Sequence, residues 1–195
     1  MDQRKHDGNG FKLKFTRNRA IFIIALSLIA FAALYYQFFV PKPIMSVLYG
    51  GYVFNFRADL REAVKVPVYP SEEALRNEMM NSQVKNITIA FKSANDTENP
   101  YYILEIYELL YPKLPLAYSI NKMNASFNRD PLIVDFYENL TGKAENPIIA
   151  LVHPVYSNET SITLENHVVL IKGKTHKDFD LAVDKFLMTV LGIEV

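Results

Sequence analysis

The 195-residue sequence balances 21 basic against 21 acidic side chains and contains neither cysteine nor tryptophan. Without cysteine the chain has no disulfides, no thiol catalysis and no thiolate metal sites. Beyond the first 19 residues the basic side chains form no run, so the composition gives no indication of nucleic-acid binding.

Residues 20–40, AIFIIALSLIAFAALYYQFFV, form an uninterrupted segment of 21 residues without a charged side chain. Because an α-helix rises about 1.5 Å per residue, this segment reaches roughly 30 Å, the thickness of the hydrocarbon core of a bilayer. The segment therefore predicts a transmembrane helix, with the lipid bilayer as the first partner of the chain. Pro41 and Pro43 are expected to end this helix.

Basic residues lie mainly on one side of the predicted membrane helix. Those that precede it are Arg4, Lys5, Lys12, Lys14, Arg17 and Arg19, whereas only Lys42 follows closely. The positive-inside bias then places residues 1–19 in the cytoplasm and residues 41–195 outside a single-pass cell-membrane protein. A cleaved signal peptide is the alternative, but the apolar run is long for one and no small-x-small cleavage site follows it.

Five Asn-x-Ser/Thr sequons are spread over the expected outer part, where about one would arise by chance. They begin at Asn86, Asn95, Asn124, Asn139 and Asn158. Asn, Ser and Thr are also common in loops and caps, which is the competing explanation. Because the number of sequons and the topology agree, we expect at least two of them to carry glycans.

The membrane-proximal segment, residues 41–66, contains Gly50-Gly51, which ends a short juxtamembrane stretch. Tyr52, Phe54 and Phe56 then alternate with Val53, Asn55 and Arg57, as in a half-buried strand. Residues 59–65 predict a helical turn. Ser71 is expected to cap a helix that runs to about residue 81.

The outer domain, residues 67–195, continues with alternating strands and helices. Residues 84–91 predict a strand with Ile87 and Ile89 facing the core and Asn86 facing away from it. The segments that follow are predicted as a polar loop at 93–100, a helix at 101–111, a short strand at 116–120, a polar segment at 121–131 and a helix or strand at 132–140. Residues 147–154, PIIALVHP, predict a central strand covered on both faces.

Residues 161–164 and 168–171 predict a hairpin whose turn contains Asn166 at a positive φ. Thr175 and Asp178 form a capping pair for the last helix, and Gly192 ends it. Apolar residues recur along one face of this helix. The order of elements predicts an α/β protein: an N-terminal transmembrane helix followed by one mixed-sheet α/β domain with a C-terminal amphipathic helix.

Motifs for catalysis or cofactor binding are missing, including G-x-S-x-G, H-E-x-x-H and a glycine-rich phosphate loop. We therefore assign no catalytic, cofactor-binding or metal-binding residues. His153 follows the predicted central strand, at an edge where α/β sheets place ligands, but a strand-end histidine bonded to backbone is the commoner case. His176 and Asp180, four residues apart, are more typical of a solvated helical turn than of a metal site.

Several segments carry a resemblance to a known group of proteins: PIIALVHP, the Asn158-Glu-Thr sequon, VVLIKGK and DLAVDKFLMTVLGI near the C-terminus, and FRADLREA and VPVYPSEEAL before them. The first four are similar to the tail domain, and the last two to the membrane-proximal part, of uncharacterised, singly membrane-anchored surface proteins of archaea. The resemblance implies a cell-surface location and supplies no catalytic residues. We therefore expect a non-enzymatic binding or scaffold role in the cell envelope, as a surface-layer or membrane-complex subunit with a protein partner. The alternatives are an envelope hydrolase or transferase with a site near His153, and a pilin-like filament subunit.

Overall fold

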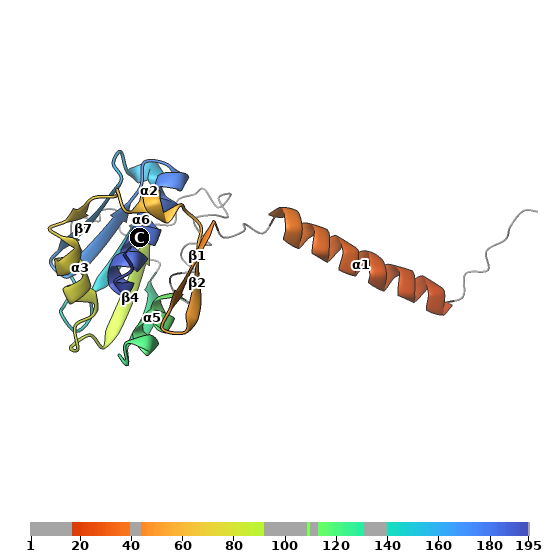
Figure 1. Cartoon of the computed structure of the whole chain (residues 1–195), viewed down its shortest axis with the longest axis horizontal. Helices are drawn as coiled ribbons and strands as arrows, with labels where there is room; N and C mark the ends of the chain where they lie inside the picture. The colour runs from red at the N-terminus through yellow and green to blue at the C-terminus, as the bar shows by residue number, and fades with distance from the viewer. Residues whose placement is uncertain (1–16, 40–43, 92–108, 110–112, 131–139, 195) are drawn as a thin grey trace, which may run out of the picture. The chain divides into compact units, whose positions relative to one another are not determined.

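The computed structural model describes residues 17–39, 44–91, 109, 113–130 and 140–194, without the side chains of 17–20, 33, 35–39 and 128–130. The chain divides into two compact units, Met1–Lys42 and Pro43–Val195 (Figure 1). The boundary between them falls inside the Pro-Lys-Pro sequence at 41–43.

The described part of the first unit is helix α1 (Arg17–Phe39), which is 23 residues long. Its described side chains, at residues 21–32 and 34, are all exposed. Among the residues whose side chains the structure describes, which in α1 are 21–32 and 34, no helical segment is both long and apolar enough to cross a membrane.

The second unit is a mixed α/β domain, as the order of elements predicted (Figure 1). Its elements are β1 (Met45–Tyr49), β2 (Tyr52–Phe56), α2 (Leu60–Ala63), β3 (Val68–Tyr69), α3 (Glu72–Met79), β4 (Asn86–Phe91), α5 (Leu114–Ile120), β5 (Ser126–Asp130), β6 (Ile148–Val152), η3 (Pro154–Tyr156), β7 (Ser161–Glu165), β8 (Val168–Lys172) and α6 (His176–Leu191).

Among the described residues, six strands form the main sheet in the order β3-β7-β8-β6-β4-β5. β5, β4, β6 and β8 run parallel, β7 runs antiparallel to β8, and β3 runs parallel to β7. The prediction of a mixed sheet is therefore confirmed. β6 has a parallel neighbour on each side, and its residues Ile149, Ala150 and Leu151 are all buried, which explains its continuous apolar sequence.

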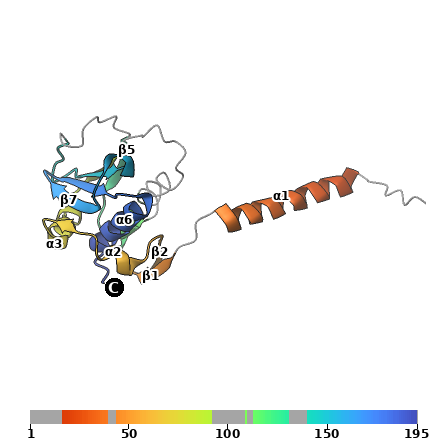
Figure 2. The same ribbon diagram turned by 90° about the horizontal axis from the view of Figure 1, so that it is seen from above.

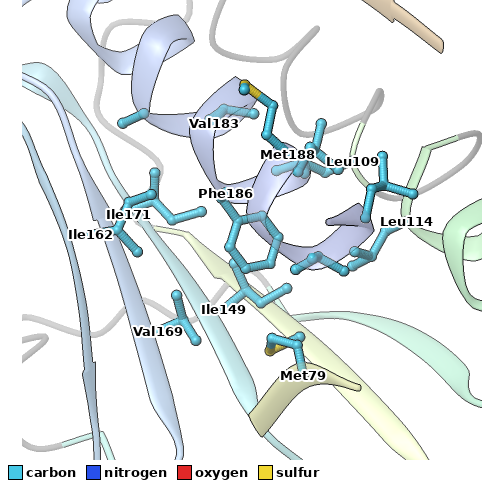
Figure 3. Packing of buried hydrophobic residues seen from close by; sticks show 14 of the residues in the cluster. Met79, Leu109, Leu114, Ile149, Ile162, Val169, Ile171, Val183, Phe186 and Met188 are labelled. Carbon is cyan, nitrogen blue, oxygen red and sulfur yellow. The ribbon is translucent and has the colours of Figure 1, made fainter. Parts of the chain in front are cut away.

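The main core lies between one face of the sheet and the helices. α6 packs against β7 and β8 and also contacts α2, α3 and α5 (Figure 1, Figure 2). The ring of Phe186 points from α6 toward the sheet, close to Ile149 (Figure 3). The opposite face of the sheet carries a smaller buried cluster of Ala90, Ala150 and Val168.

β1 and β2 form a separate antiparallel hairpin, which confirms the predicted strand at 52–56 and adds a partner strand to it. Its turn uses Gly50 at φ 56° and Gly51 at φ 83°, the left-handed region that glycine adopts readily. Gly50 also lies so close to Ile120 that a Cβ there would be 2.5 Å from that side chain. Phe54 and Phe56 on the inner face are buried, so the hairpin is part of the domain.

Residues 116–120 belong to helix α5, and the predicted strand there is wrong. The helix starts two residues earlier, with Pro115 in its first turn, where a helix tolerates proline. Leu114, Ala117 and Tyr118 are buried at a spacing of i, i+3 and i+4, which only a helix places on one face. The hydroxyl of Tyr118 donates a hydrogen bond to the carbonyl of Met79, which joins α5 to the end of α3.

Part of the predicted polar segment at 121–131 forms β5, the last strand of the sheet. A strand at the edge pairs on one side only, so its sequence, SFNRD, can remain polar. The predicted loop at 93–100 lies outside the described residues. So do the predicted helix at 101–111, except for buried Leu109, and the segment at 132–140, except for Leu140.

The helix ends of the domain follow their predicted caps. The N–H of Ala74 donates to Ser71 Oγ at 3.0 Å, at the start of α3. The N–H of Asp178 donates to Thr175 Oγ1 at 3.2 Å, at the start of α6. Gly192 has φ 69° after the last turn, and Asn166 has φ 50° in the β7–β8 turn.

Candidate functional site

The carboxyl ends of β6 and β8 bring two histidines together. His153 follows β6 and caps the short helix η3, where its Nδ1 accepts the N–H of Val155 at 3.2 Å. His176 begins α6, which follows β8, and the centroid of its ring lies 5.2 Å from that of His153 in an edge-to-face arrangement. Two parallel neighbouring strands therefore place side chains that are 23 residues apart in ring contact.

The surroundings of His153 are those of a structural histidine. Its side chain is 1 % exposed, and its Nδ1 is bonded to backbone, as predicted for the commoner role of a strand-end histidine. A hydrolase or transferase centred on His153 requires a polar cleft through which a substrate reaches the imidazole. The burial of the ring against His176 argues against such a site at this position.

Metal ligands do not gather in the part of the domain that is described. No group of three or more His, Asp or Glu side chains there lies close enough to hold a metal ion. His176 and Asp180 are both half-buried on the first turns of α6. A catalytic zinc ion, for comparison, takes three protein ligands.

Asp184 and Lys113 form a buried ion pair that the sequence analysis did not predict. Asp184 lies on α6 and is fully buried, and its Oδ2 accepts the N–H groups of Arg57 at 3.1 Å and Ala58 at 2.9 Å. Lys113 Nζ lies 3.8 Å from Asp184 Oδ1 and 5.4 Å from the centre of the Phe56 ring. The pair therefore connects α6 with the end of β2 and the start of α5.

A second polar connection joins α6 to α3. Lys185 Nζ donates to Glu72 Oε1 at 2.6 Å, and the hydroxyl of Thr189 donates to Glu72 Oε2 at 3.4 Å. Lys185 is buried, although it belongs to a helix predicted to be amphipathic. The Asp184-Lys185 pair is the one charged interruption of the sequence 181–193, and this is the signal by which both contacts could have been suspected.

The described sequons differ in exposure. Asn124 and Asn158 are exposed, whereas Asn86 is half-buried at the start of β4. Asn86 lines a pocket of about 290 Å³ together with Lys143 and Glu145. Asn95 and Asn139 lie outside the described residues.

Comparison with known proteins yields no relative for this chain. No family model matches it. Neither a curated protein nor a solved structure matches it either. The resemblance to archaeal surface proteins therefore stays a prediction, and the function has to be argued from the residues of this chain.

Proposed function

We propose that the chain is a single-pass protein of the cell membrane whose α/β domain has a binding or scaffold role outside the membrane, in the cell envelope. The observation that carries the proposal is the uncharged sequence of residues 20–40, most of α1. At about 1.5 Å per residue, the 23 residues of α1 extend roughly 35 Å, long enough for a bilayer.

The exposed side chains of α1 support the same proposal. Among its described side chains, nine large apolar ones are exposed: Ile21, Phe22, Ile23, Ile24, Leu26, Leu28, Ile29, Phe31 and Leu34. Transfer of each from water to an apolar surrounding is worth about 1.5–3 kcal/mol, or roughly 14–27 kcal/mol together. A helix with this surface is strongly driven into lipid.

A binding or scaffold role is favoured over an enzymatic one by the state of His153. The hydrolase alternative rested on the position of His153 at the end of the central strand, and the burial of its ring leaves that alternative without an accessible imidazole. The exposed sequons at Asn124 and Asn158 suit a domain that faces the outside of the cell. We infer an envelope protein as the partner, in a surface layer or a membrane complex.

Topology is tested with single cysteines, since the natural chain has none. Asn9→Cys reports on the basic tail and Glu73→Cys on the outer domain, each in the full chain expressed in the native host. A membrane-impermeant maleimide should label position 73 on intact cells and position 9 only after lysis. The reverse pattern, or release of the chain from membranes by alkaline carbonate, would refute the proposal.

Glycosylation and the partner are tested on protein purified from native membranes. The intact mass should exceed that of the full chain and fall after deglycosylation, and Asn158→Gln should lose one glycan. An N-terminus trimmed close to residue 20 would instead favour the pilin-like alternative. Isolation in mild detergent should retain a partner protein, and a lone monomer under these conditions would contradict the binding role.

A further inference from the structure

The outer face of the β1–β2 hairpin carries exposed apolar side chains. Ile44 just before β1, Leu48 in β1 and Val53 in β2 are 64 %, 72 % and 62 % exposed. Leu48 and Val53 are directly opposite each other in the register, close to the Gly50-Gly51 turn. We call these three residues the hairpin face.

The hairpin face is held in place by the rest of the domain. The opposite side of the hairpin is anchored by buried Phe54 and Phe56, and Tyr49 packs edge-to-face on Phe54 at 6.2 Å between ring centres. On the outer side, the hydroxyl of Ser46 donates to Asn55 Oδ1 at 2.8 Å. The exposed apolar side chains therefore project from a defined strand pair.

The sequence around the hairpin is almost free of charge. Lys42 is the single charged residue between Arg19 and Arg57, and residues 43–56 contain none. The outer face of a two-stranded hairpin that meets water normally carries charged residues. This face carries none, and its two polar side chains, Ser46 and Asn55, are hydrogen-bonded to each other, which favours an apolar surrounding.

The chain length between α1 and the hairpin limits what that surrounding can be. Four residues, 40–43, separate the last residue of α1 from Ile44. From residue 39 to residue 44, a fully extended chain spans at most about 18 Å between Cα atoms. That distance crosses the headgroup layer of one leaflet and extends only a short way beyond it. If α1 spans the bilayer, Ile44 is thus confined to the neighbourhood of the membrane surface.

We propose that the hairpin face inserts into the interfacial layer of the outer leaflet and docks the domain on lipid. This inference rests on the proposed membrane anchor. Transfer of the exposed apolar side chains of Leu48 and Val53 from water into this layer is favourable. Asp184, bonded to the N–H groups of Arg57 and Ala58 directly after β2, then fixes the hairpin to α6, so docking sets the orientation of the whole domain.

The test uses the full chain in phosphatidylcholine nanodiscs, with one chain per disc and a spin label on a single introduced cysteine. Leu48→Cys and Val53→Cys report on the hairpin face, Ile29→Cys on α1 and Glu73→Cys on an exposed charged site of α3. Collision of the label with oxygen, which concentrates in lipid, is compared with collision with a water-soluble nickel chelate. Because all four sites are exposed, the variants should fold, and circular dichroism checks this.

The oxygen-to-nickel ratio at positions 48 and 53 should be several-fold higher than at position 73. If it equals the ratio at position 73 while position 29 remains in lipid, the hairpin inference is overturned and the anchor stands. If position 29 also contacts water, the anchor itself fails. A label at position 48 that becomes shielded from both reagents only in discs with two chains would show a second copy as the occupant, which also overturns lipid docking.

Discussion

Replacing Asp184 by asparagine isolates the charge of the buried ion pair. Asparagine keeps one carbonyl oxygen, so it can still accept the N–H groups of Arg57 and Ala58. What it removes is the negative charge 3.8 Å from Lys113 Nζ. We expect the free energy of unfolding of the α/β domain to fall by about 3 kcal/mol, the lower end for breaking a buried ion pair.

The expected magnitude follows from distance and burial. At 3.8 Å and an effective dielectric constant of about 20, two unit charges attract by about 4 kcal/mol. Part of this is offset because the neutral amide is easier to bury than the carboxylate. The exposed pair Glu62–Lys65 is shorter, at 2.7 Å, but its side chains are more than half exposed, so we expect Glu62→Gln to cost at most about 1 kcal/mol.

The assay is urea unfolding of the full chain in mild detergent, followed by circular dichroism, because urea does not screen charges. With a slope near 2 kcal/mol per M, a loss of about 3 kcal/mol lowers the midpoint by about 1.5 M. Lys113→Met and the double variant with Asp184→Asn complete a double-mutant cycle, which measures the interaction free energy between the two side chains. The double variant should be more stable than the sum of the single effects implies, by about 1.5 kcal/mol or more.

A midpoint for Asp184→Asn equal to that of Glu62→Gln would refute the reasoning, because burial would then make no difference to the value of the pair. Additive effects in the Lys113 cycle would equally show that the two charges do not stabilise each other. In that case Asp184 would act through its backbone hydrogen bonds alone.

Three further outcomes are expected. Burial raises the pKa of Tyr118 above its ordinary 10.0, so the folded state resists ionisation of this hydroxyl and the free energy of unfolding falls as the pH rises past 10. Tyr118→Phe should cost about 1 kcal/mol at neutral pH. It should also reduce the loss of stability at alkaline pH, measured by urea titration. Gly173→Ala should destabilise the domain by more than about 2 kcal/mol in the same assay, because the added Cβ would lie 2.3 Å from a backbone nitrogen of α6. Gly51→Ala has open space around the added Cβ and should cost about 1 kcal/mol, because alanine is disfavoured at its φ of 83°. The Lys172 ammonium, hydrogen-bonded to Glu159, lowers the pKa of that carboxyl, so carbon NMR should show it titrating below an ordinary glutamate and returning to the ordinary range in Lys172→Met.

Features that depend on neighbouring residues could be predicted from the sequence. Ser71 and Thr175 cap helices through bonds that close within three residues, and Asn166 adopts its positive φ within a two-residue turn. The central strand was recognisable because both its faces are covered, which requires apolar residues at every position. These interactions need no knowledge of the rest of the chain.

Features that depend on distant residues were missed. The sequence LAYSI shows no period over five residues, and its helical face emerges only when Leu114 and the contact with α3 are included. The sequence of β5 remains polar because β5 is an edge strand. Its position at the edge depends on the order of strands in the sheet, which the sequence near β5 does not reveal.

The same reason applies to the candidate site. The likeness of His153 to a backbone-bonded strand-end histidine was predictable, but its contact with His176 depends on β6 and β8 being neighbours. The role of Asp184 could not be predicted, because nothing nearby in the sequence reveals that residues 57 and 58 cover it.

The hydrogen bond between Asp184 and Arg57 can form only after Asp184 has been synthesised. The two residues are 127 positions apart, and at 5–20 residues per second their synthesis is separated by roughly 6–25 s. During that interval β2 has left the ribosome without the helix that secures it. If the chain is exported and glycosylated while it is being made, as we propose, even Asn86, later half-buried in β4, would be within reach of the enzyme before the domain folds.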